Sequence, residues 1–453
     1  IEEGNQLIFL SGAAGTGKTT IVRSLAMDIE KSVVVAPTGI SALTAGGMTI
    51  HSFFQINPFK VRPELKEIKG AMNRESVEKI ECLIIDEISM VRADLFDAID
   101  MTLRRSKSDN RPFGGISVII VGDPYQLDPV LKKSEEPPFY HGKKYEGPYF
   151  FHSEAFRRFI KDEKFSAYSL TKNFRADEDP YYASLLDKIR VGEELRSSVN
   201  EINSHCRKDI SQSEDSGLFL TSINKDAERI NKQKLSTLPS EEKLFEGVLE
   251  GKYYKENTES FPADLLLELK EGAKVIFISN DDERRWVNGS QGLIKLIPPD
   301  QTFIQIEIDG ETHDVYRHKW EKLKYIYDEE LDEFYMESVG SFSQFPIKLG
   351  WALTIHRSQS LTLDNCIVDF GSGAFTHGQA YVALSRVRSI DDIVLMSDLQ
   401  VSDIKIDNHV NEFYKSIYFQ NDHNKKSNEN RSVREEISFL KNRIIELEKK
   451  ISD

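Results

Sequence analysis

The stretch Gly12-Ala13-Ala14-Gly15-Thr16-Gly17-Lys18-Thr19 matches the pattern G-x-x-x-x-G-K-[ST] of a phosphate-binding loop. An apolar run at residues 7–10 precedes it, and a segment with helical periodicity that contains Ile21, Leu25 and Ile29 follows it. In this context the glycines allow a turn whose backbone N–H groups surround phosphate oxygens, and the start of the helix adds positive potential. The stretch therefore predicts a strand, a nucleotide-binding loop and a helix.

The same loop predicts how a nucleotide is held. We expect Lys18 to neutralise the β- and γ-phosphates and the Thr19 hydroxyl to bind Mg²⁺. The residues expected to contact the nucleotide are Gly15, Thr16, Gly17, Lys18, Thr19 and Thr20.

Two carboxylates follow a second apolar run, in Cys82-Leu83-Ile84-Ile85-Asp86-Glu87. We expect Asp86 to lie in the outer coordination of the metal and Glu87 to polarise the attacking water. An acidic pair after a strand is also a common helix N-cap, but a phosphate-binding loop upstream favours the catalytic interpretation.

A third apolar run, residues 118–121, leads into Gly122-Asp123-Pro124-Tyr125-Gln126. Loops at the carboxyl ends of such strands bind ligands in open α/β sheets. Gln126 is therefore expected to contact the γ-phosphate as an uncharged sensor, with an ordinary turn as the alternative.

Apolar runs alternate with helical segments along most of the chain, which predicts an α/β fold with parallel sheets. The runs are at residues 7–10, 33–36, 82–85, 118–121 and 165–170, and then at 218–221, 275–278, 366–369 and 393–396. We predict two tandem lobes, residues 1–165 and 166–420.

Two segments interrupt this alternation. The first, about residues 54–78, is rich in Lys, Arg, Glu and Pro. The second, about residues 287–345, contains an alternating run at 304–308, the turn dipeptide Asp309-Gly310 and a run at 312–316, which together predict a hairpin. Runs at 325–327 and 334–336 predict another hairpin, so a small β insert is expected.

The tail, residues 421–453, begins as polar linker sequence, and apolar residues then recur at heptad spacing over residues 433–451. The pattern fits a terminal helix packed on its own protein, and it also fits weak self-association through a coiled coil.

Composition limits the kinds of partner. The 453 residues carry 59 Lys and Arg against 74 Asp and Glu, a formal net charge of −15, so a nucleic-acid site must be a local groove in an acidic body. No apolar run approaches the length of a membrane span, no secretion signal is evident, and Cys82, Cys206 and Cys366 have no metal-ligand spacing. We therefore expect a cytoplasmic protein.

Together these motifs resemble those of a superfamily-one helicase. Ser89-Met90, Leu95-Phe96-Asp97 and Leu103-Arg104 are similar to the signature of the Pif (petite integration frequency) family of 5′-to-3′ DNA helicases. The resemblance extends to about Tyr414 and implies two RecA-like lobes. It also implies that the 54–78 insert acts as a strand-separating wedge and that the 287–345 insert is an SH3-like module.

The resemblance implies DNA contacts through backbone N–H groups, hydroxyls and a ring for base stacking. The implied residues are Pro37, Thr38, Gly39, His51, Ser52 and Phe53, and farther along the chain Thr354, His356 and Arg357. Gln359, in the same motif as Arg357, is implied to contact the nucleotide.

The resemblance also implies two arginines at the γ-phosphate, Arg175 and Arg386. Guanidinium groups in such positions contribute roughly 10³–10⁵ in rate. Because Arg386 lies in the predicted second lobe, we expect it to act only when the lobes close on ATP. With Lys18, Glu87 and Gln126, these arginines complete the expected catalytic set.

The implied function is an ATP- and Mg²⁺-dependent helicase that moves 5′-to-3′ on single-stranded DNA and unwinds forked duplex DNA as a monomer. Two other functions are compatible with the same motifs. One is an RNA-directed superfamily-one motor, and the other is a non-translocating clamp that uses ATP.

Overall fold

The chain divides into two units in the computed structural model, which describes residues 6–56, 74–131, 145–161, 164–174, 178–206, 217–252, 261–359, 361–371 and 373–427. The first unit comprises Ile1–Asp177, Lys324–Glu337 and Ile406–Asp453, and the second comprises Glu178–Leu323 and Ser338–Lys405. The division at 177 lies later than the predicted boundary at 165, because Phe165–Leu170 pairs with the first strand of the chain.

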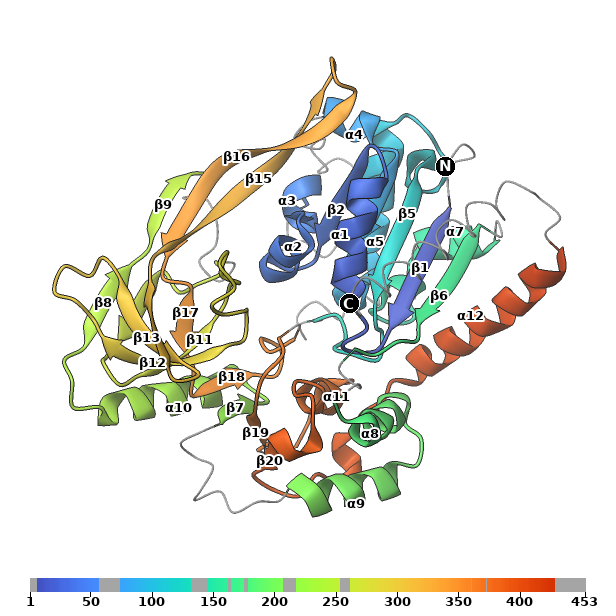
Figure 1. The fold of residues 1–453 in the computed structure, drawn as a ribbon. Helices are drawn as coiled ribbons and strands as arrows, with labels where there is room; N and C mark the ends of the chain where they lie inside the picture. Colours follow the sequence, from blue (N-terminus) through green and yellow to red (C-terminus); the bar gives the residue numbers. More distant parts are fainter. Residues whose placement is uncertain are drawn as a thin grey trace. The chain divides into compact units, whose positions relative to one another are not determined.

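The first unit is built on a parallel sheet with the strand order β3-β2-β4-β5-β1-β6 (Figure 1). In that order the strands are β3 (Met48–Thr49), β2 (Ser32–Ala36), β4 (Cys82–Ile85), β5 (Ser117–Gly122), β1 (Leu7–Gly12) and β6 (Phe165–Leu170). Every residue of β1 and β4 is buried, which explains why these strands are continuous apolar runs rather than alternating ones.

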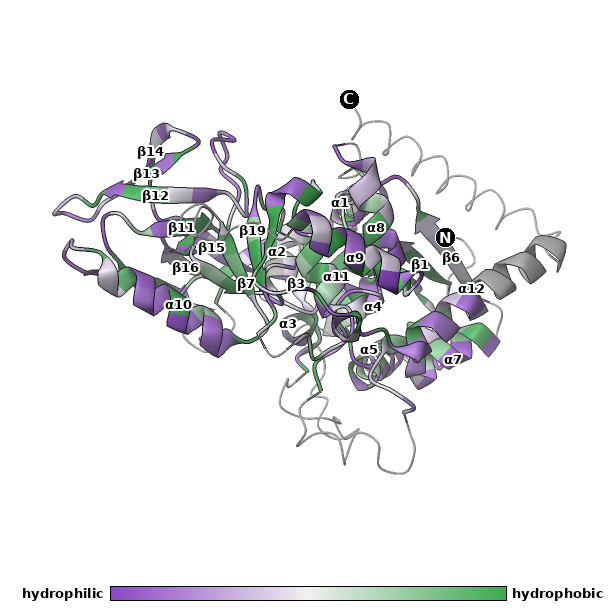
Figure 2. Ribbon diagram, turned by 90° about the horizontal axis from the view of Figure 1, so that it is seen from below, coloured by the Kyte–Doolittle hydropathy of each residue, from purple (hydrophilic) through white to green (hydrophobic). Residues whose placement is uncertain are grey.

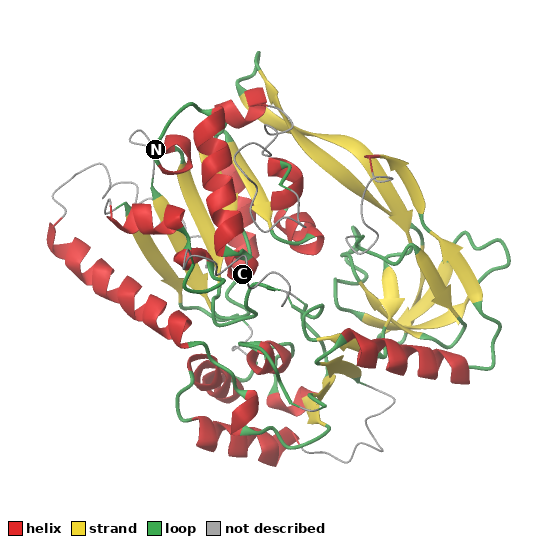
Figure 3. Cartoon of the chain, turned by 180° about the vertical axis from the view of Figure 1, so that it is seen from behind, coloured by secondary structure: helices red, strands yellow, loops and turns green. Residues whose placement is uncertain are grey.

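Helices flank this sheet (Figure 3). They are α1 (Lys18–Asp28), α2 (Gly39–Ala45), α3 (Ile50–Phe54), α4 (Arg74–Lys79), α5 (Ala93–Ser106), α7 (Glu154–Lys161) and α12 (Asn408–Ser427), with the short 3₁₀ turns η1 (Ile88–Met90), η2 (Pro112–Gly115) and η4 (Phe150–His152). Helix α1 packs Ile21, Val22 and Leu25 on Ile8 and Leu10 of β1. The apolar spacing that predicted this helix is therefore its buried face.

The second unit contains its own parallel sheet, in the order β18-β7-β19-β20. Its strands are β18 (Ala352–Thr354), β7 (Leu218–Thr221), β19 (Cys366–Asp369) and β20 (Ile393–Leu395), and its helices are α8 (Pro180–Val191), α9 (Leu195–Cys206), α10 (Asn224–Thr237) and α11 (Gln379–Leu384), with η8 (Ile390–Asp392) and η9 (Val401–Asp403). Strands β7 and β19 are hydrophobic, whereas α10 is largely hydrophilic (Figure 2). The two parallel sheets confirm the predicted α/β fold.

A β-rich module is inserted in the second unit. An antiparallel sheet in the order β14-β13-β12-β11-β17 forms its centre, and β10-β8 and β15-β16-β9 form smaller sheets. The strands are β8 (Lys243–Glu246), β9 (Val248–Gly251), β10 (Leu266–Leu269), β11 (Lys274–Phe277), β12 (Gln291–Leu296), β13 (Ile304–Ile308), β14 (Glu311–Val315), β15 (His318–Asp328), β16 (Glu333–Gln344) and β17 (Ile347–Leu349).

The module corrects one prediction and extends another. The run at 275–278 was assigned to the second parallel sheet, but β11 pairs antiparallel with β12 and β17. An apolar run buried on both faces looks the same in either kind of sheet, so periodicity could not separate them. The predicted β insert is confirmed, and it begins before residue 287 because β11 belongs to it.

Both predicted hairpins are present. Asp309 and Gly310 have φ of 51° and 84°, and they join β13 to β14 in the two-residue turn that such positive φ values produce. Strands β15 and β16 are much longer than the predicted runs, and their distal ends, Lys324–Glu337, belong to the first unit.

The other interruptions are only partly within the described residues. Of the insert at 54–78, residues 57–73 lie outside the description, and α4 begins at Arg74. The linker predicted from residue 421 is instead helical as far as Ser427, because α12 continues through it. A helix anchored by tertiary packing can extend through polar sequence that would not nucleate one. The heptad region 433–451 lies outside the described residues.

Helix α12 is anchored in the first unit by aromatic packing. Phe413 stacks on Phe151 with ring centroids 4.3 Å apart, and its ring also contacts Phe9 of β1 at 5.7 Å. Within the described parts of the chain, no helix combines the length and the apolarity that a membrane span requires.

His152 next to α12 predicts a pH dependence of stability. Its side chain is buried, its ring meets His409 of α12 edge-on at 4.9 Å, and burial, followed by the charge of His409, lowers the pKa of His152 to about 4. The unfolded chain binds this proton near pH 6.5, so the folded state loses stability as the pH falls from about 6.5 towards 4.

Between pH 7 and pH 5, we expect the free energy of unfolding of the wild-type protein to fall by about 1 kcal/mol more than that of His152→Asn. Denaturant unfolding at the two pH values measures the difference. His205→Asn, at an exposed position on α9, is the control and should behave as the wild type does. Equal losses in all three proteins would contradict the assignment.

Candidate nucleotide site

The predicted motifs of the first unit gather at one edge of its sheet. Because the strands are parallel, their carboxyl ends open on the same side. The phosphate-binding loop follows β1, Asp86 follows β4, and the loop with Gln126 follows β5. The structure therefore brings three separate stretches of sequence to one place.

Backbone geometry explains the glycines of the loop. Gly15 and Gly17 have φ of 83° and 75°, a region that residues with a side chain rarely occupy. A Cβ at Gly12 would lie 2.5 Å from the Oγ1 of Thr16, whose side chain is buried beneath the loop. Helix α1 begins directly after, at Lys18, so its first N–H groups face the loop.

Lys18, Thr19 and Asp86 converge at the start of α1. The Lys18 ammonium donates to the carbonyl oxygens of Gly12 and Ala13, both at 2.9 Å, and so lies over the loop. The Thr19 hydroxyl donates to Oδ2 of Asp86 at 3.1 Å. The two residues predicted to bind a metal ion are therefore hydrogen-bonded to each other across sixty-seven positions of sequence.

The electrostatics of this point favour a cation. Burial, followed by the nearby Glu87 carboxylate, raises the pKa of Asp86 to about 7, although the Thr19 hydroxyl and the Lys18 charge oppose the shift. A buried carboxylate with another beside it is stabilised when a positive ligand binds.

Glu87 is held in an unusual backbone conformation. Its φ is 51°, its side chain is buried, and its N–H donates to Oδ1 of Asp86 at 2.9 Å. A left-handed backbone conformation is uncommon for a residue with a side chain. Such conformations concentrate at functional sites.

Gln126 shares a buried carboxylate with other groups. Its Nε2 lies 3.5 Å from Oδ2 of Asp123, and its backbone N–H donates to the Asp123 carbonyl at 2.9 Å. Asp123 is fully buried and accepts from the Tyr414 hydroxyl, which in turn lies 2.6 Å from the Ser11 hydroxyl. No role was predicted for Ser11, Asp123 or Tyr414; the motif around Asp123 was a signal for that residue, but no local pattern pointed to Tyr414.

The strand β6 leads back to the loop. The backbone N–H of Phe174 donates to the carbonyl of Gly15 at 3.0 Å. Arg175, the next residue and a predicted contact of the γ-phosphate, lies outside the described residues.

The first predicted DNA motif follows β2 at the same edge. Pro37, Thr38 and Gly39 are half-buried, and the Thr38 hydroxyl accepts from the N–H of Ser41 at 3.1 Å. The Thr38 and Ser41 side chains form a capping box that starts α2, so Thr38 has a structural task besides any contact with DNA.

The second predicted DNA motif lies on α3. His51 and Ser52 are half-buried, and burial, followed by the charge of Arg92, lowers the pKa of His51, which keeps the imidazole neutral at pH 7. Phe53 is only 7% exposed, with its ring edge-on to Phe54 at 4.8 Å and to Tyr325 of β15 at 5.8 Å. Stacking on a base would require this ring to leave its packing.

The predicted residues of the second unit cluster within that unit. Thr354 ends β18 and is buried, His356 is half-buried with its ring 6.5 Å from that of Phe375, and Arg357 is exposed. Gln359, in the turn that follows, is 9% exposed. Arg357 is thus the most accessible cation of the motif.

Arg386 is buried within the second unit. It is 1% exposed, and its guanidinium donates to the carbonyl oxygens of Val382 (2.7 Å), Ser358 (3.0 Å) and Leu361 (3.2 Å) and to the Ser385 hydroxyl (2.8 Å). It therefore ties α11 to the motif that contains Gln359. The predicted contact with the γ-phosphate would require the guanidinium to exchange these acceptors for phosphate oxygens.

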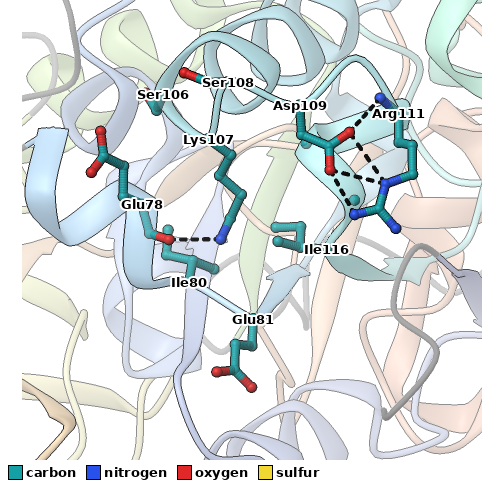
Figure 4. Close-up of a pocket in the computed structure, with 11 residues that line it drawn as sticks. Glu78, Ile80, Glu81, Ser106, Lys107, Ser108, Asp109, Arg111 and Ile116 are labelled. Atoms are coloured by element: carbon teal, nitrogen blue, oxygen red, sulfur yellow. Dashed lines mark hydrogen bonds and ion pairs between the residues drawn. The ribbon is translucent and has the colours of Figure 1, made fainter.

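A polar pocket of about 520 Å³ lies at the other end of β4 and β5 (Figure 4). Lys107 donates to the carbonyl of Glu78 in it, and Arg111 pairs with Asp109. None of the predicted site residues lines this pocket.

Comparisons with known proteins find DNA helicases that are similar to this chain. Residues 1–195 match the model of the PIF1-like helicase family. The ATP-dependent DNA helicase Pif1 of Campylobacter jejuni is 30% identical over 446 residues, which cover 91% of this chain and 95% of the relative. The chain spans about three fifths, 61%, of the length of its Danio rerio and Homo sapiens relatives.

Solved structures of a Bacteroides Pif1 are also similar. The complex with ADP-AlF4 has a TM-score of 0.80 and 33% identity, covering 93% of this chain and 95% of the other. The complex with single-stranded DNA has a TM-score of 0.64 and 34% identity, covering 91% and 93%.

The burial of Arg386 predicts a large effect on stability. Arg386→Ala removes a charge-assisted donor from three carbonyl groups and leaves a cavity. We therefore expect the free energy of unfolding to fall by about 3 kcal/mol. Arg388→Ala is the control, because Arg388 is exposed and pairs with Glu178 at the surface; its loss should be below about 1 kcal/mol. Denaturant unfolding measures both, and an Arg386→Ala protein as stable as the control would contradict the structural role.

Proposed function

Since this chain belongs to the PIF1-like helicase family, we propose that it is an ATP- and Mg²⁺-dependent DNA helicase that moves 5′-to-3′ along single-stranded DNA and opens duplex DNA. The observation that carries the proposal is the convergence of Lys18, Thr19 and Asp86 at the start of α1. Such a set of residues serves phosphoryl transfer, in which the protein positions the phosphates and neutralises charge.

The donor atoms at this point fit Mg²⁺. Thr19 and Asp86 offer a hydroxyl and a carboxylate oxygen, and Mg²⁺ is usually bound by one or two such ligands together with water and phosphate oxygens. Bound there, the ion would offset negative charge on the β- and γ-phosphates. Lys18 would turn from the Gly12 and Ala13 carbonyls towards the same phosphates.

Hydrolysis also needs a positioned water. Glu87 is the candidate to accept its proton, because it follows β4 directly after Asp86 and is withdrawn from bulk solvent. Gln126, oriented by Asp123, is proposed to sense the γ-phosphate through its amide. Arg175 and Arg386 are proposed to add positive charge, the latter only after releasing its protein acceptors.

DNA is proposed to bind along the segments that follow β2, β3 and β18. Neutral His51 and the hydroxyls of Thr38 and Ser52 suit hydrogen bonds to phosphate and sugar, and exposed Arg357 suits a phosphate contact. Thr354 is buried, so a contact through its hydroxyl would require that segment to open. These contacts are local, as the net charge of −15 requires. Opening one base-pair step costs about 1.4 kcal/mol in stacking, so a repeated nucleotide cycle can drive it.

The first test concerns hydrolysis. We expect single-stranded DNA to stimulate ATP turnover, and Lys18→Ala and Glu87→Gln to lower that turnover by at least about 100-fold while DNA binding stays measurable. Glu81→Gln is the matched control: Glu81 precedes the same strand β4 at its opposite end, and turnover should stay unchanged. Equal hydrolysis with and without DNA would contradict the proposal.

The second test concerns direction. Strand separation should require ATP and should proceed on a duplex with a 5′ single-stranded overhang but not on one with a 3′ overhang. Strand separation is measured on two labelled duplexes, one with each overhang, under single-turnover conditions with protein in excess. Separation that starts equally well from 3′ overhangs, or that fails on both, would contradict a 5′-to-3′ motor.

A further inference from the structure

Helix α12 reaches the nucleotide edge of the first unit through one tyrosine. The Tyr414 hydroxyl lies 2.6 Å from the Ser11 hydroxyl and donates to Oδ1 of Asp123 at 3.4 Å. Ser11 directly precedes Gly12 of the phosphate-binding loop, and Asp123 directly follows β5. One hydroxyl therefore joins the strand before the loop to the carboxylate beside Gln126.

The loop after β5 is held to α12 by a second set of contacts. The Tyr125 ring stacks on that of Tyr414 with centroids 4.7 Å apart and an interplanar angle of 14°. The Tyr125 hydroxyl donates to Oδ1 of Asn411, one turn earlier on α12, at 2.9 Å. The loop that carries Gln126 thus rests on a face of α12 built from Asn411 and Tyr414.

Burial makes the Tyr414 hydroxyl important for Asp123. Asp123 is 0% exposed, and a buried carboxylate depends on donors in place of water. Its donors include the Tyr125 N–H at 3.2 Å, the Gln126 amide at 3.5 Å and the Tyr414 hydroxyl at 3.4 Å. Without the Tyr414 hydroxyl, Oδ1 of Asp123 would lose a hydrogen-bond donor. The Asp123 carboxylate would then rotate towards another donor.

We propose that Tyr414 is a positioning residue for nucleotide hydrolysis, which acts by holding Asp123 so that the Gln126 amide is aimed at the γ-phosphate. The proposal rests on the proposed function, because it assumes that Gln126 contacts the nucleotide. Tyr414 itself does not touch the nucleotide in this role. It follows that α12, which begins just after the second unit ends at Lys405, forms part of the nucleotide site of the first unit.

The test removes the hydroxyl and keeps the ring. In the full chain, Tyr414→Phe should lower kcat for DNA-stimulated ATP hydrolysis about tenfold while KM for ATP changes less than about twofold. The matched control is Tyr149→Phe, since the Tyr149 hydroxyl also donates to a residue near α12, to Asp407 at 3.1 Å, but Tyr149 lies at the start of η4 rather than in the loop after β5. Both variants should lose similar thermal stability, and only Tyr414→Phe should lose turnover.

A double-mutant cycle separates positioning from general damage. In a Gln126→Ala background, Tyr414→Phe should change kcat less than about twofold, because the group it positions is already gone. Three results would each overturn the inference and leave the proposed function standing. They are the same tenfold factor in both backgrounds, an equal loss of kcat in Tyr149→Phe, and normal kcat in Tyr414→Phe. A wild-type chain that hydrolyses no ATP would overturn the proposed function and the inference with it.

Discussion

The hydrogen bond between Thr19 and Asp86 depends on a constraint that governs the whole first unit: parallel strands end on the same side of a sheet. Strands β1 and β4 are fully buried, so neither can shift without exposing apolar surface. The rigid sheet therefore fixes where the loop, the carboxylates and the Gln126 segment meet. Phosphoryl transfer requires positioning of this kind, because the protein contributes little covalent chemistry to the reaction and acts mainly by placing groups and neutralising charge.

Much of this arrangement could be predicted from the sequence, and the reasons are local. Continuous apolar runs indicate buried strands, and the strand-like stretches at residues 82–85, 165–170, 218–221 and 366–369 have those bounds in the structure. The turn at Asp309-Gly310 was predictable because few other residues accept positive φ twice in succession. Motifs with strict spacing, such as the loop at Gly12, carry their geometry in their own residues.

The remaining features depend on contacts between distant residues. Strand β11 was assigned to the wrong sheet because its partners, β12 and β17, decide its direction. The burial of Arg386 among backbone carbonyls and of Phe53 beneath Tyr325 follows from tertiary packing that spacing does not encode. Tyr414 lies more than two hundred and ninety positions from Asp123 in sequence, and nothing in its neighbours marks it.

The most direct test of the central claim is a spectroscopic measurement of metal and nucleotide at the Thr19–Asp86 pair. With Mn²⁺ in place of Mg²⁺ and ADP as the nucleotide, electron paramagnetic resonance should detect one tightly bound ion coupled to phosphorus only when the nucleotide is present. The signal should weaken strongly in Asp86→Asn and Thr19→Val. An unchanged phosphorus-coupled signal in both variants would mean that the metal and the phosphates lie elsewhere.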